Sequence, residues 1–364
     1  LLDRDVEFLP SDKQLAERRN EDHGLTRPEL SVLLAYSKNV LYQQLLDSSF
    51  PDDGYLEGDL LRYFPKTMRE QFTGEIISHQ LRREIIATVT TNSIVNRSGI
   101  TFWHALREDT GMETCDIARA YTIARDAYDI RALWRDIEGL DGKVSAETQA
   151  AMFTQGSIFV ERVSHWFLRN CPQPLDIAKI IEEYAPGIGV FMEEWRDMIS
   201  DTVAKACDSK TKRFIDMGAP QDMAERMARL EAISSACDVV MVANKSGHPL
   251  ADVGRIYFEL GARLRLGWLR RSASRMAPES YWDRLAVESI ITNLTDHQRR
   301  LTAEVIANRC EDDSCSTAVD SWYRAFEKEV SRFERFIDEL KTAETITFPM
   351  LVVAQRHVEG ICSV

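Results

Sequence analysis

The sequence predicts an all-α fold, a multi-helix bundle, and three observations support this class. Apolar side chains recur at helical spacing along most of the chain, for example over residues 30–45 and 322–340. No alternating β pattern repeats. No strand is followed by a glycine-rich turn and a helix, which is the unit that binds dinucleotides. We therefore expect packed helices joined by short connections.

The first expected helix has a clear start signal. Residues 1–24 are polar and charged, and we expect them to form a linker from an upstream catalytic domain. The Leu at position 1, where Met would stand, agrees with an upstream segment. Thr26 then offers an N-cap, Pro28 sits in the first turn, and Glu29 completes a capping box.

Turn residues divide the elements that follow. Residues 48–54 hold proline, glycine and two aspartates and predict a loop. A short helix near residues 56–64 is expected to stop at Pro65, and a long helix is expected over residues 67–96. Late in the chain, residues 322–340 predict one amphipathic helix, and a terminal helix is expected after about residue 344.

An internal repeat suggests how the chain is organised. Residues 111–137 match residues 247–273 at a constant offset of 136, and each segment resembles a helix–turn–helix unit. We interpret the repeat as a duplicated unit near residues 98–137 and 234–273, and chance similarity of two amphipathic helices is the alternative. The predicted subdomains are residues 25–210 and 211–364. The identical pairs are Gly111/Gly247, Asp116/Asp252, Arg119/Arg255, Tyr121/Tyr257, Leu133/Leu269 and Arg135/Arg271.

Composition and charge exclude several classes of function. The 364 residues are 44% hydrophobic and 28% charged, which is typical of a globular protein. A formal net charge of -13 disfavours nucleic acid and anionic membrane surfaces as partners. No apolar run approaches the ~20 residues that span a bilayer, and no signal peptide opens the sequence. We expect a cytoplasmic protein.

The cysteines fit a reducing compartment and do not form a metal site. Their number, seven, is odd, and no pair has the C-x-x-C spacing. The closest pair lacks a second pair to complete a zinc site. The cysteines are Cys115, Cys171, Cys207, Cys237, Cys310, Cys315 and Cys362.

No catalytic, cofactor-binding or metal-binding constellation can be assembled from the sequence. The Gly187-Ile188-Gly189 run lacks a third glycine and a preceding strand, so we expect a loop. His165 follows Glu161 at helical spacing, which favours an ion pair. The terminal group of His357, Glu359 and Cys362 lacks a fourth metal ligand. The sequence thus predicts no catalytic residue, no bound cofactor and no metal.

The strongest candidate contact site is a basic patch without any acidic side chain, which also contains Trp268. Such a patch can hold a phosphate, a carboxylate effector or an acidic partner surface. The alternative is a solvated helix end, because cations favour helix C-termini. A DNA-reading role is disfavoured by the net charge. The candidate residues are Arg263, Arg265, Arg270 and Arg271, with Arg275 at the end of the patch.

Several motifs in order resemble the large bacterial NAD-specific glutamate dehydrogenases. The longest is LTRPELSVLLAY at residues 25–36. The similarity is strongest from the start to about Trp134 and covers most of the chain. The others are LDR at 2–4, EFLPS at 7–11, RYFP at 62–65, LRREIIAT at 81–88, VNRSGITF at 95–102, RAY at 119–121 and LW at 133–134.

The resemblance implies a function for the parent protein and a different role for this chain. Members of the family oxidise L-glutamate with NAD and water to 2-oxoglutarate, ammonia and NADH, in an upstream Rossmann domain. No position here matches their catalytic or nucleotide motifs, so no catalytic residue is transferred and the chain alone is expected to be inactive. The resemblance implies a helical C-terminal region with a structural, assembly or regulatory role, in a homo-oligomer whose cofactor is NAD.

Two other classes of function remain open at this stage. The chain could be a free-standing helical protein-interaction module, which the sequence upstream of residue 1 would decide. It could also be a self-contained helical enzyme that holds a cofactor inside the bundle. The hypothesis of a helical enzyme requires acid and base residues that converge on one site, and the sequence does not offer them.

Overall fold

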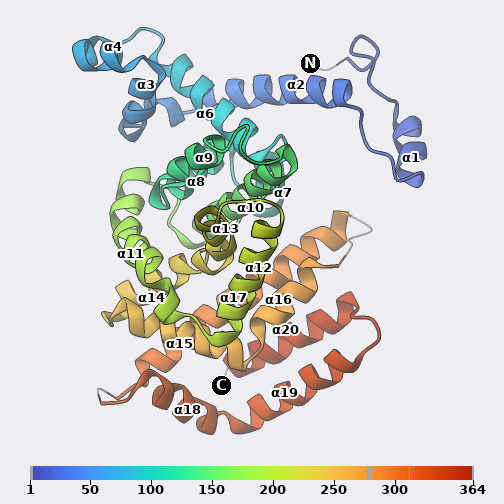
Figure 1. Cartoon of the computed structure of the whole chain (residues 1–364), viewed down its shortest axis with the longest axis vertical. Helices are drawn as coiled ribbons and strands as arrows, with labels where there is room; N and C mark the ends of the chain where they lie inside the picture. The colour runs from blue at the N-terminus through green and yellow to red at the C-terminus, as the bar shows by residue number, and fades with distance from the viewer. Residues whose placement is uncertain (1–2, 277–280, 311, 363–364) are drawn as a thin grey trace. The chain divides into compact units, whose positions relative to one another are not determined.

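The computed structural model describes residues 3–276, 281–310 and 312–362, and all regular secondary structure in them is helical (Figure 1). The predicted all-α class is confirmed. The chain divides into two compact units. Unit 1 comprises residues 1–141 and 149–182, and unit 2 comprises residues 142–148 and 183–364. The predicted boundary at residue 210 would fall inside a helix, α12, and the division at that residue stays a prediction.

Unit 1 is built from the first ten α-helices, two 3-10 turns and the start of α11. Its most buried helix is α8, which contacts the helices on either side of it in sequence. The elements are α1 (Asp12–Asn20), α2 (Arg27–Leu46), η1 (Phe50–Asp52), η2 (Gly54–Leu56), α3 (Glu57–Tyr63), α4 (Lys66–Gln71), α5 (Thr73–Ile77), α6 (Arg82–Ser98), α7 (Phe102–Thr110), α8 (Thr114–Ala127), α9 (Ile130–Glu138), α10 (Ala146–Asn170) and α11 (Ile177–Met198).

Unit 2 surrounds α15, whose buried residues include Val253, Ile256 and Tyr257. This helix contacts α14, α16, α17 and α18. The elements of unit 2 are α12 (Asp201–Asp216), α13 (Gln221–Ile233), α14 (Ala236–Ser246), α15 (Leu250–Arg263), α16 (Leu266–Ser274), α17 (Tyr281–Ala307), α18 (Cys315–Ala325), α19 (Glu327–Thr342) and α20 (Phe348–Cys362).

The predicted start of α2 and the terminal helix α20 are confirmed. The Glu29 carboxylate accepts the backbone N–H of Thr26 at 2.6 Å, which is half of the predicted capping box. The predicted linker, residues 1–24, contains the short helix α1, which has no buried residue. Arg18 of α1 pairs with Glu29 at 2.9 Å and fastens this segment to the start of α2.

The long helix predicted over residues 67–96 is wrong, because the structure has α4, α5 and α6 there. Phe72 leaves the helical region at φ -128° and ψ 37°, and Gly74 follows, a residue with low helix propensity. The second break is held by the His79 ring, whose Nδ1 accepts the backbone N–H of Leu81 at 3.1 Å. A side chain that bonds to the backbone competes with the helical ladder at that point.

The single amphipathic helix predicted over residues 322–340 is also wrong. It is split into α18 and α19 at Phe326, which has φ -111° and ψ 26°. The apolar stripe itself is buried on both helices, because a break between helices need not move the residues that face the core. Its buried members are Trp322, Val330, Phe333, Ile337 and Leu340.

The two repeat segments have matching helix bounds at the predicted offset. Helix α8 corresponds residue for residue to α15, and α9 corresponds to α16. Gly111 and Gly247 end the preceding helices in the left-handed region, at φ 68° and 72°. A residue in that region also precedes each second helix, Asp129 at φ 46° and Arg265 at φ 54°. These similarities support the duplication, which stays a prediction.

The loop predicted at Gly187-Ile188-Gly189 is wrong, because all three residues lie inside α11. The first glycine is explained by close packing on α14. A Cβ at Gly187 would stand 2.9 Å from Cγ2 of Val240, whereas a Cβ at Gly189 would meet nothing within 4 Å. The glycine therefore permits an approach between helices and does not form a phosphate-binding turn.

We predict opposite effects of the same substitution at these two positions. Gly187→Ala should lower the free energy of unfolding by about 1–2 kcal/mol, because the new methyl group overpacks against Val240. Gly189→Ala is the matched control and should raise it by roughly 0.5–1 kcal/mol through helix propensity. Urea unfolding followed by circular dichroism measures both, and equal effects would contradict the packing explanation.

Candidate functional site

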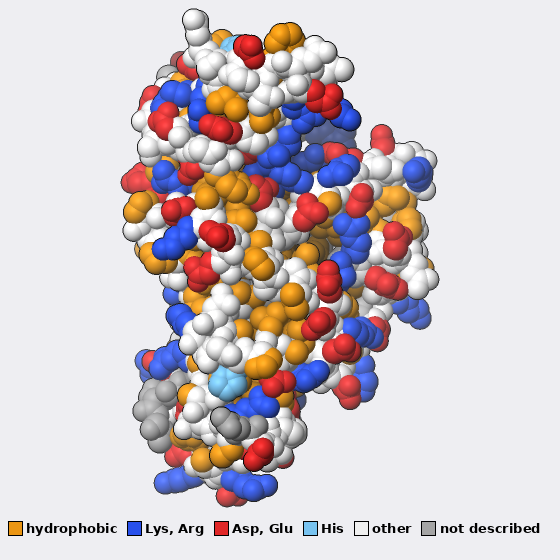
Figure 2. Space-filling model, turned by 90° about the vertical axis from the view of Figure 1, so that its left-hand side faces the viewer, with side chains coloured by type: hydrophobic (Ala, Val, Ile, Leu, Met, Phe, Trp, Pro, Cys, Tyr) orange, Lys and Arg blue, Asp and Glu red, His pale blue; other side chains and the backbone are white. Residues whose placement is uncertain are grey.

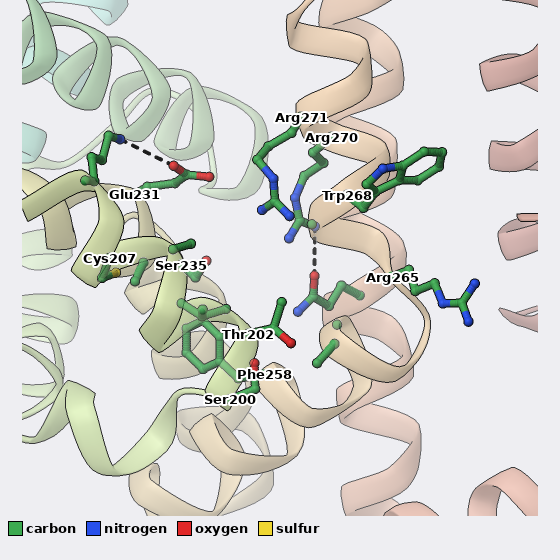
Figure 3. A pocket seen from close by; sticks show the side chains of 18 of the residues that line it. Ser200, Thr202, Cys207, Glu231, Ser235, Phe258, Arg265, Trp268, Arg270 and Arg271 are labelled. Carbon is green, nitrogen blue, oxygen red and sulfur yellow. Dashed lines mark hydrogen bonds and ion pairs between the residues drawn. The ribbon is translucent and has the colours of Figure 1, made fainter. Parts of the chain in front are cut away.

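A cavity of about 410 Å³ lies within unit 2, and part of the predicted arginine patch lines it. Helices α12 and α13 form one wall and α15 and α16 the other, with Gln298 of α17 also in the lining (Figure 3). Pockets of this size hold small molecules in other proteins. The cavity is therefore a candidate ligand site, and it is the one that contains the arginines singled out from the sequence.

Arg270 and Arg271 of α16 both point into this cavity (Figure 3). Arg270 donates from Nη1 to Oε1 of Gln298 at 2.7 Å, and Gln298 donates from Nε2 to the carbonyl oxygen of Tyr257 at 2.8 Å. Neither arginine forms an ion pair with a carboxylate among the described residues. The lining also contains the carboxylate of Glu231, which pairs with Lys210, so the two guanidinium groups face the cavity without a carboxylate partner of their own among the described residues.

The other two predicted arginines do not belong to this pair. Arg263 pairs with Asp320 at 2.6 Å and also with Glu259, and its guanidinium lies 5.2 Å from the ring centre of Tyr323. Arg265 is also among the lining residues, but it pairs with Asp338 and its side chain points away from Arg270 and Arg271 (Figure 3). The charges of Arg263 and Arg265 are compensated within unit 2, whereas Arg270 and Arg271 line the cavity without a carboxylate partner among the described residues.

The opposite wall carries groups that the sequence reasoning missed as site residues. Lys210 of α12 pairs across the wall with Glu231 of α13 at 3.4 Å (Figure 3). The hydroxyl oxygen of Ser200 is buried without a hydrogen-bond partner in the structure. The rest of this wall is largely apolar, and burial raises the pKa of the Cys207 thiol. The helical spacing of Val203, Cys207 and Lys210 was the available signal.

Unit 1 has a buried charge cluster at the positions that correspond to the cavity lining. Arg125 of α8 is bonded to Asp59 at 2.8 Å and to Asp126 at 2.7 Å, and Arg131 bonds Asp126 at 2.9 Å. The side chains of Arg125 and Asp59 are 0% and 2% exposed. At the offset of 136, Gly261, Ala262 and Gly267 correspond to Arg125, Asp126 and Arg131. All three of these small residues line the cavity in unit 2.

The cluster fixes the charge state of Asp59. Burial alone would raise the pKa of this carboxyl, but the charges of Arg125 and Arg131 outweigh burial and lower the pKa to about 2. A depressed pKa in the folded state contributes stability that is present above about pH 4 and is lost as pH falls toward about 2. The cluster is thus a structural element that is sensitive to acid.

We predict that Asp59→Asn lowers the free energy of unfolding by about 3 kcal/mol at pH 7, because it leaves Arg125 buried with less compensation. The variant should also lose less stability than the wild type between about pH 4 and pH 2. Urea unfolding across this pH range measures both effects. Glu70→Ala removes an exposed pair with Lys66 and should change stability by less than about 0.5 kcal/mol, and an equal loss in both variants contradicts the prediction.

The other residues singled out from the sequence lie apart from the cavity. His165 hydrogen-bonds Asp109 of α7, and this bond is the main cause of the lowered pKa of Asp109. The His357 ring lies 4.9 Å from that of Phe336. No group of three or more His, Cys, Asp or Glu able to hold a metal occurs in the described residues, and the Cys362 side chain lies outside them.

The face of the molecule displayed in Figure 2 carries charges of both signs. Figure 2 shows Lys and Arg side chains interspersed with Asp and Glu over the face that it displays. None of the described helices is both long and apolar enough to cross a membrane. Among the described residues we find an all-helical protein with a cationic cavity and no dinucleotide-binding strand–turn–helix unit.

Comparison with known proteins identifies the family of this helical protein. The sequence model described as "Glutamate dehydrogenase, C-terminal" matches residues 22–360. The chain therefore belongs to the glutamate dehydrogenase C-terminal family.

Curated relatives carry the same family name. The chain is 32% identical over 357 residues to an NAD-specific glutamate dehydrogenase of Pseudomonas aeruginosa and 31% identical to one of Halomonas elongata. A third, from Mycobacterium tuberculosis, is 28% identical. Each alignment covers 98% of this chain and 22% of the relative, so the chain spans about a fifth of the length of the relatives that it matches.

Proposed function

We propose that this chain is the C-terminal helical region of an NAD-specific glutamate dehydrogenase. The observation that carries the proposal is the match of the family over residues 22–360. The parent enzyme then converts L-glutamate, NAD and water to 2-oxoglutarate, ammonia and NADH. Its nicotinamide chemistry resides in a catalytic domain upstream of these residues, which is also the first partner of this region.

The region itself has a structural, assembly or regulatory role in a cytoplasmic homo-oligomer. Its described residues are packed helices, and the groups that line its cavity include no acid–base pair aimed at a common point. A regulatory role is supported by Arg270 and Arg271, which face the cavity without carboxylate partners among the described residues. Arg263 and Arg265 are better explained as structural ion pairs.

We predict that the 364-residue chain alone neither binds NADH nor oxidises glutamate, because the nucleotide site belongs to the upstream domain. Fluorescence titration with NADH and an absorbance assay at saturating glutamate measure these activities, with the complete parent enzyme as the positive control. Circular dichroism of the isolated chain first establishes that it is helical. Hydride transfer by the isolated folded chain would refute the proposal.

A second measurement separates this proposal from a free-standing interaction module. In the purified parent enzyme, this region and the catalytic domain should be found in one polypeptide. Its stop-codon variant, which ends before the position of residue 22, should change in oligomeric state or in effector response. A parent gene without a dehydrogenase domain favours the module instead.

A further inference from the structure

We propose that the cavity between α12/α13 and α15/α16 binds a small dicarboxylate through Arg270 and Arg271. The family match assigns no ligand to this cavity. Under the proposed function the ligand is an effector of the parent enzyme. Binding is measured directly, so failure of this proposal and failure of the proposed function are distinguishable.

The charge cluster of unit 1 and the cavity of unit 2 lie at corresponding positions of the two repeat segments. There, Arg125 and Arg131 are compensated by the carboxylates of Asp59 and Asp126. In unit 2 the corresponding positions of the duplicated segment are Gly261, Ala262 and Gly267, which supply neither charge. Two arginines and one aspartate of unit 1 thus correspond to small residues in unit 2, and a cavity lies at these small residues.

The guanidinium of Arg271 points into the cavity and lies close to Gly267 (Figure 3). Nη1 of Arg271 lies 3.3 Å from the place where a Cβ on Gly267 would stand. Because Gly267 corresponds to Arg131, the Arg271 guanidinium extends into space that a side chain at this position would take. An arginine from another position of the segment thus occupies this space in unit 2, and the carboxylate in the lining, Glu231, is paired with Lys210.

The lining of the cavity favours a dicarboxylate over a phosphate as the ligand. A guanidinium binds either group through two parallel hydrogen bonds. The facing wall carries apolar side chains such as Val203 and Ala206, and Phe258 of α15 also lines the cavity; these groups suit the carbon chain of a dicarboxylate better than the wholly polar surface of a phosphate. The unpartnered hydroxyl of Ser200 on the same lining can donate a hydrogen bond to a second carboxylate.

A hydrogen-bond network holds the Arg270 side chain in place for ligand binding. Gln298 bonds Arg270 on one side and the Tyr257 carbonyl on the other. Gly261 permits this arrangement, because a Cβ there would stand 2.3 Å from Nε2 of Gln298 and would collide with it. A side chain that is held before binding loses less conformational entropy when the ligand arrives.

The test is isothermal titration calorimetry of the complete parent enzyme with malonate, succinate and adipate. Inorganic phosphate and pyrophosphate form the second arm. We expect one of the dicarboxylates to bind more tightly than either phosphate compound. Arg271→Ala should weaken this binding about ten- to a hundred-fold, as expected for loss of a charged hydrogen bond. Arg275→Ala is the matched control, because Arg275 is exposed and does not line the cavity, and it should leave binding unchanged.

A second variant distinguishes loss of ligand binding from loss of folding. Gly267→Asp places a carboxylate in the first turn of α16, four residues before Arg271, where both the helix dipole and the i, i+4 spacing favour it. It should abolish dicarboxylate binding while raising the melting temperature, because the protein then supplies the missing charge itself. Gly267→Ala controls for the added volume.

The outcomes decide the proposal without reference to catalysis. Binding to the wild type that disappears in Arg271→Ala and Gly267→Asp but persists in Arg275→Ala supports the site. Tighter binding of pyrophosphate than of any dicarboxylate overturns the ligand class. Absence of binding at millimolar concentrations, or binding that is unchanged in Arg271→Ala, overturns the site, while glutamate oxidation by the same preparation keeps the proposed function intact.

Discussion

The burial of α8 and α15 is the constraint on which the rest of the structure depends. Helices that are covered on most sides leave little room for charge, because a buried ion needs a compensating partner. Helix α8 meets this constraint by pairing Arg125 with Asp59 and Asp126. Helix α15 meets it by carrying glycine at residues 254 and 261, where the side chains of Met198 and Gln298 pack directly on the backbone.

Both solutions follow from the same amphipathic pattern, and this pattern was readable from the sequence. Tyr121 and Tyr257 are wholly buried at matching positions, as the apolar stripe predicts. The capping residues Thr26 and Glu29 are also local signals, since their partners lie within one turn of the chain. The helical class and these elements could therefore be predicted without knowledge of the tertiary contacts.

The errors arise where a distant contact or a competing local bond decides the outcome. Gly187 was expected in a loop because glycine usually marks one, but Val240 on another helix requires a residue without a side chain there. The long helix over residues 67–96 is interrupted by the His79 ring, which bonds to the backbone two residues later. Periodicity is continuous across both places, so it could not reveal either.

The arginine patch shows the same limit for the candidate site. A run of cations is visible in the sequence, but the carboxylates that compensate part of it come from α18 and α19, far along the chain. Asp320 pairs with Arg263 and Asp338 pairs with Arg265. Arg270 and Arg271 therefore remain as the arginines that line the cavity without a carboxylate partner among the described residues. Sequence reasoning could predict that charge gathers here and could not predict which charges remain available.

The difference between the charge cluster of unit 1 and the open cavity of unit 2 has a consequence for stability. In unit 1 the protein's own carboxylates compensate the arginines. Above the acid pH range, the cluster therefore stabilises the fold whether or not a ligand is present. In unit 2, an anion that binds the folded state alone adds RT ln(1 + [L]/Kd) to its stability, about 2.7 kcal/mol when its concentration is 100 times Kd. If a dicarboxylate binds as proposed, the packing of α12 against α15 then depends on the concentration of that ligand. Under that proposal, a carboxylate from solution takes the place of one supplied by the protein, so the stability of unit 2 reports the ligand concentration without any change of fold.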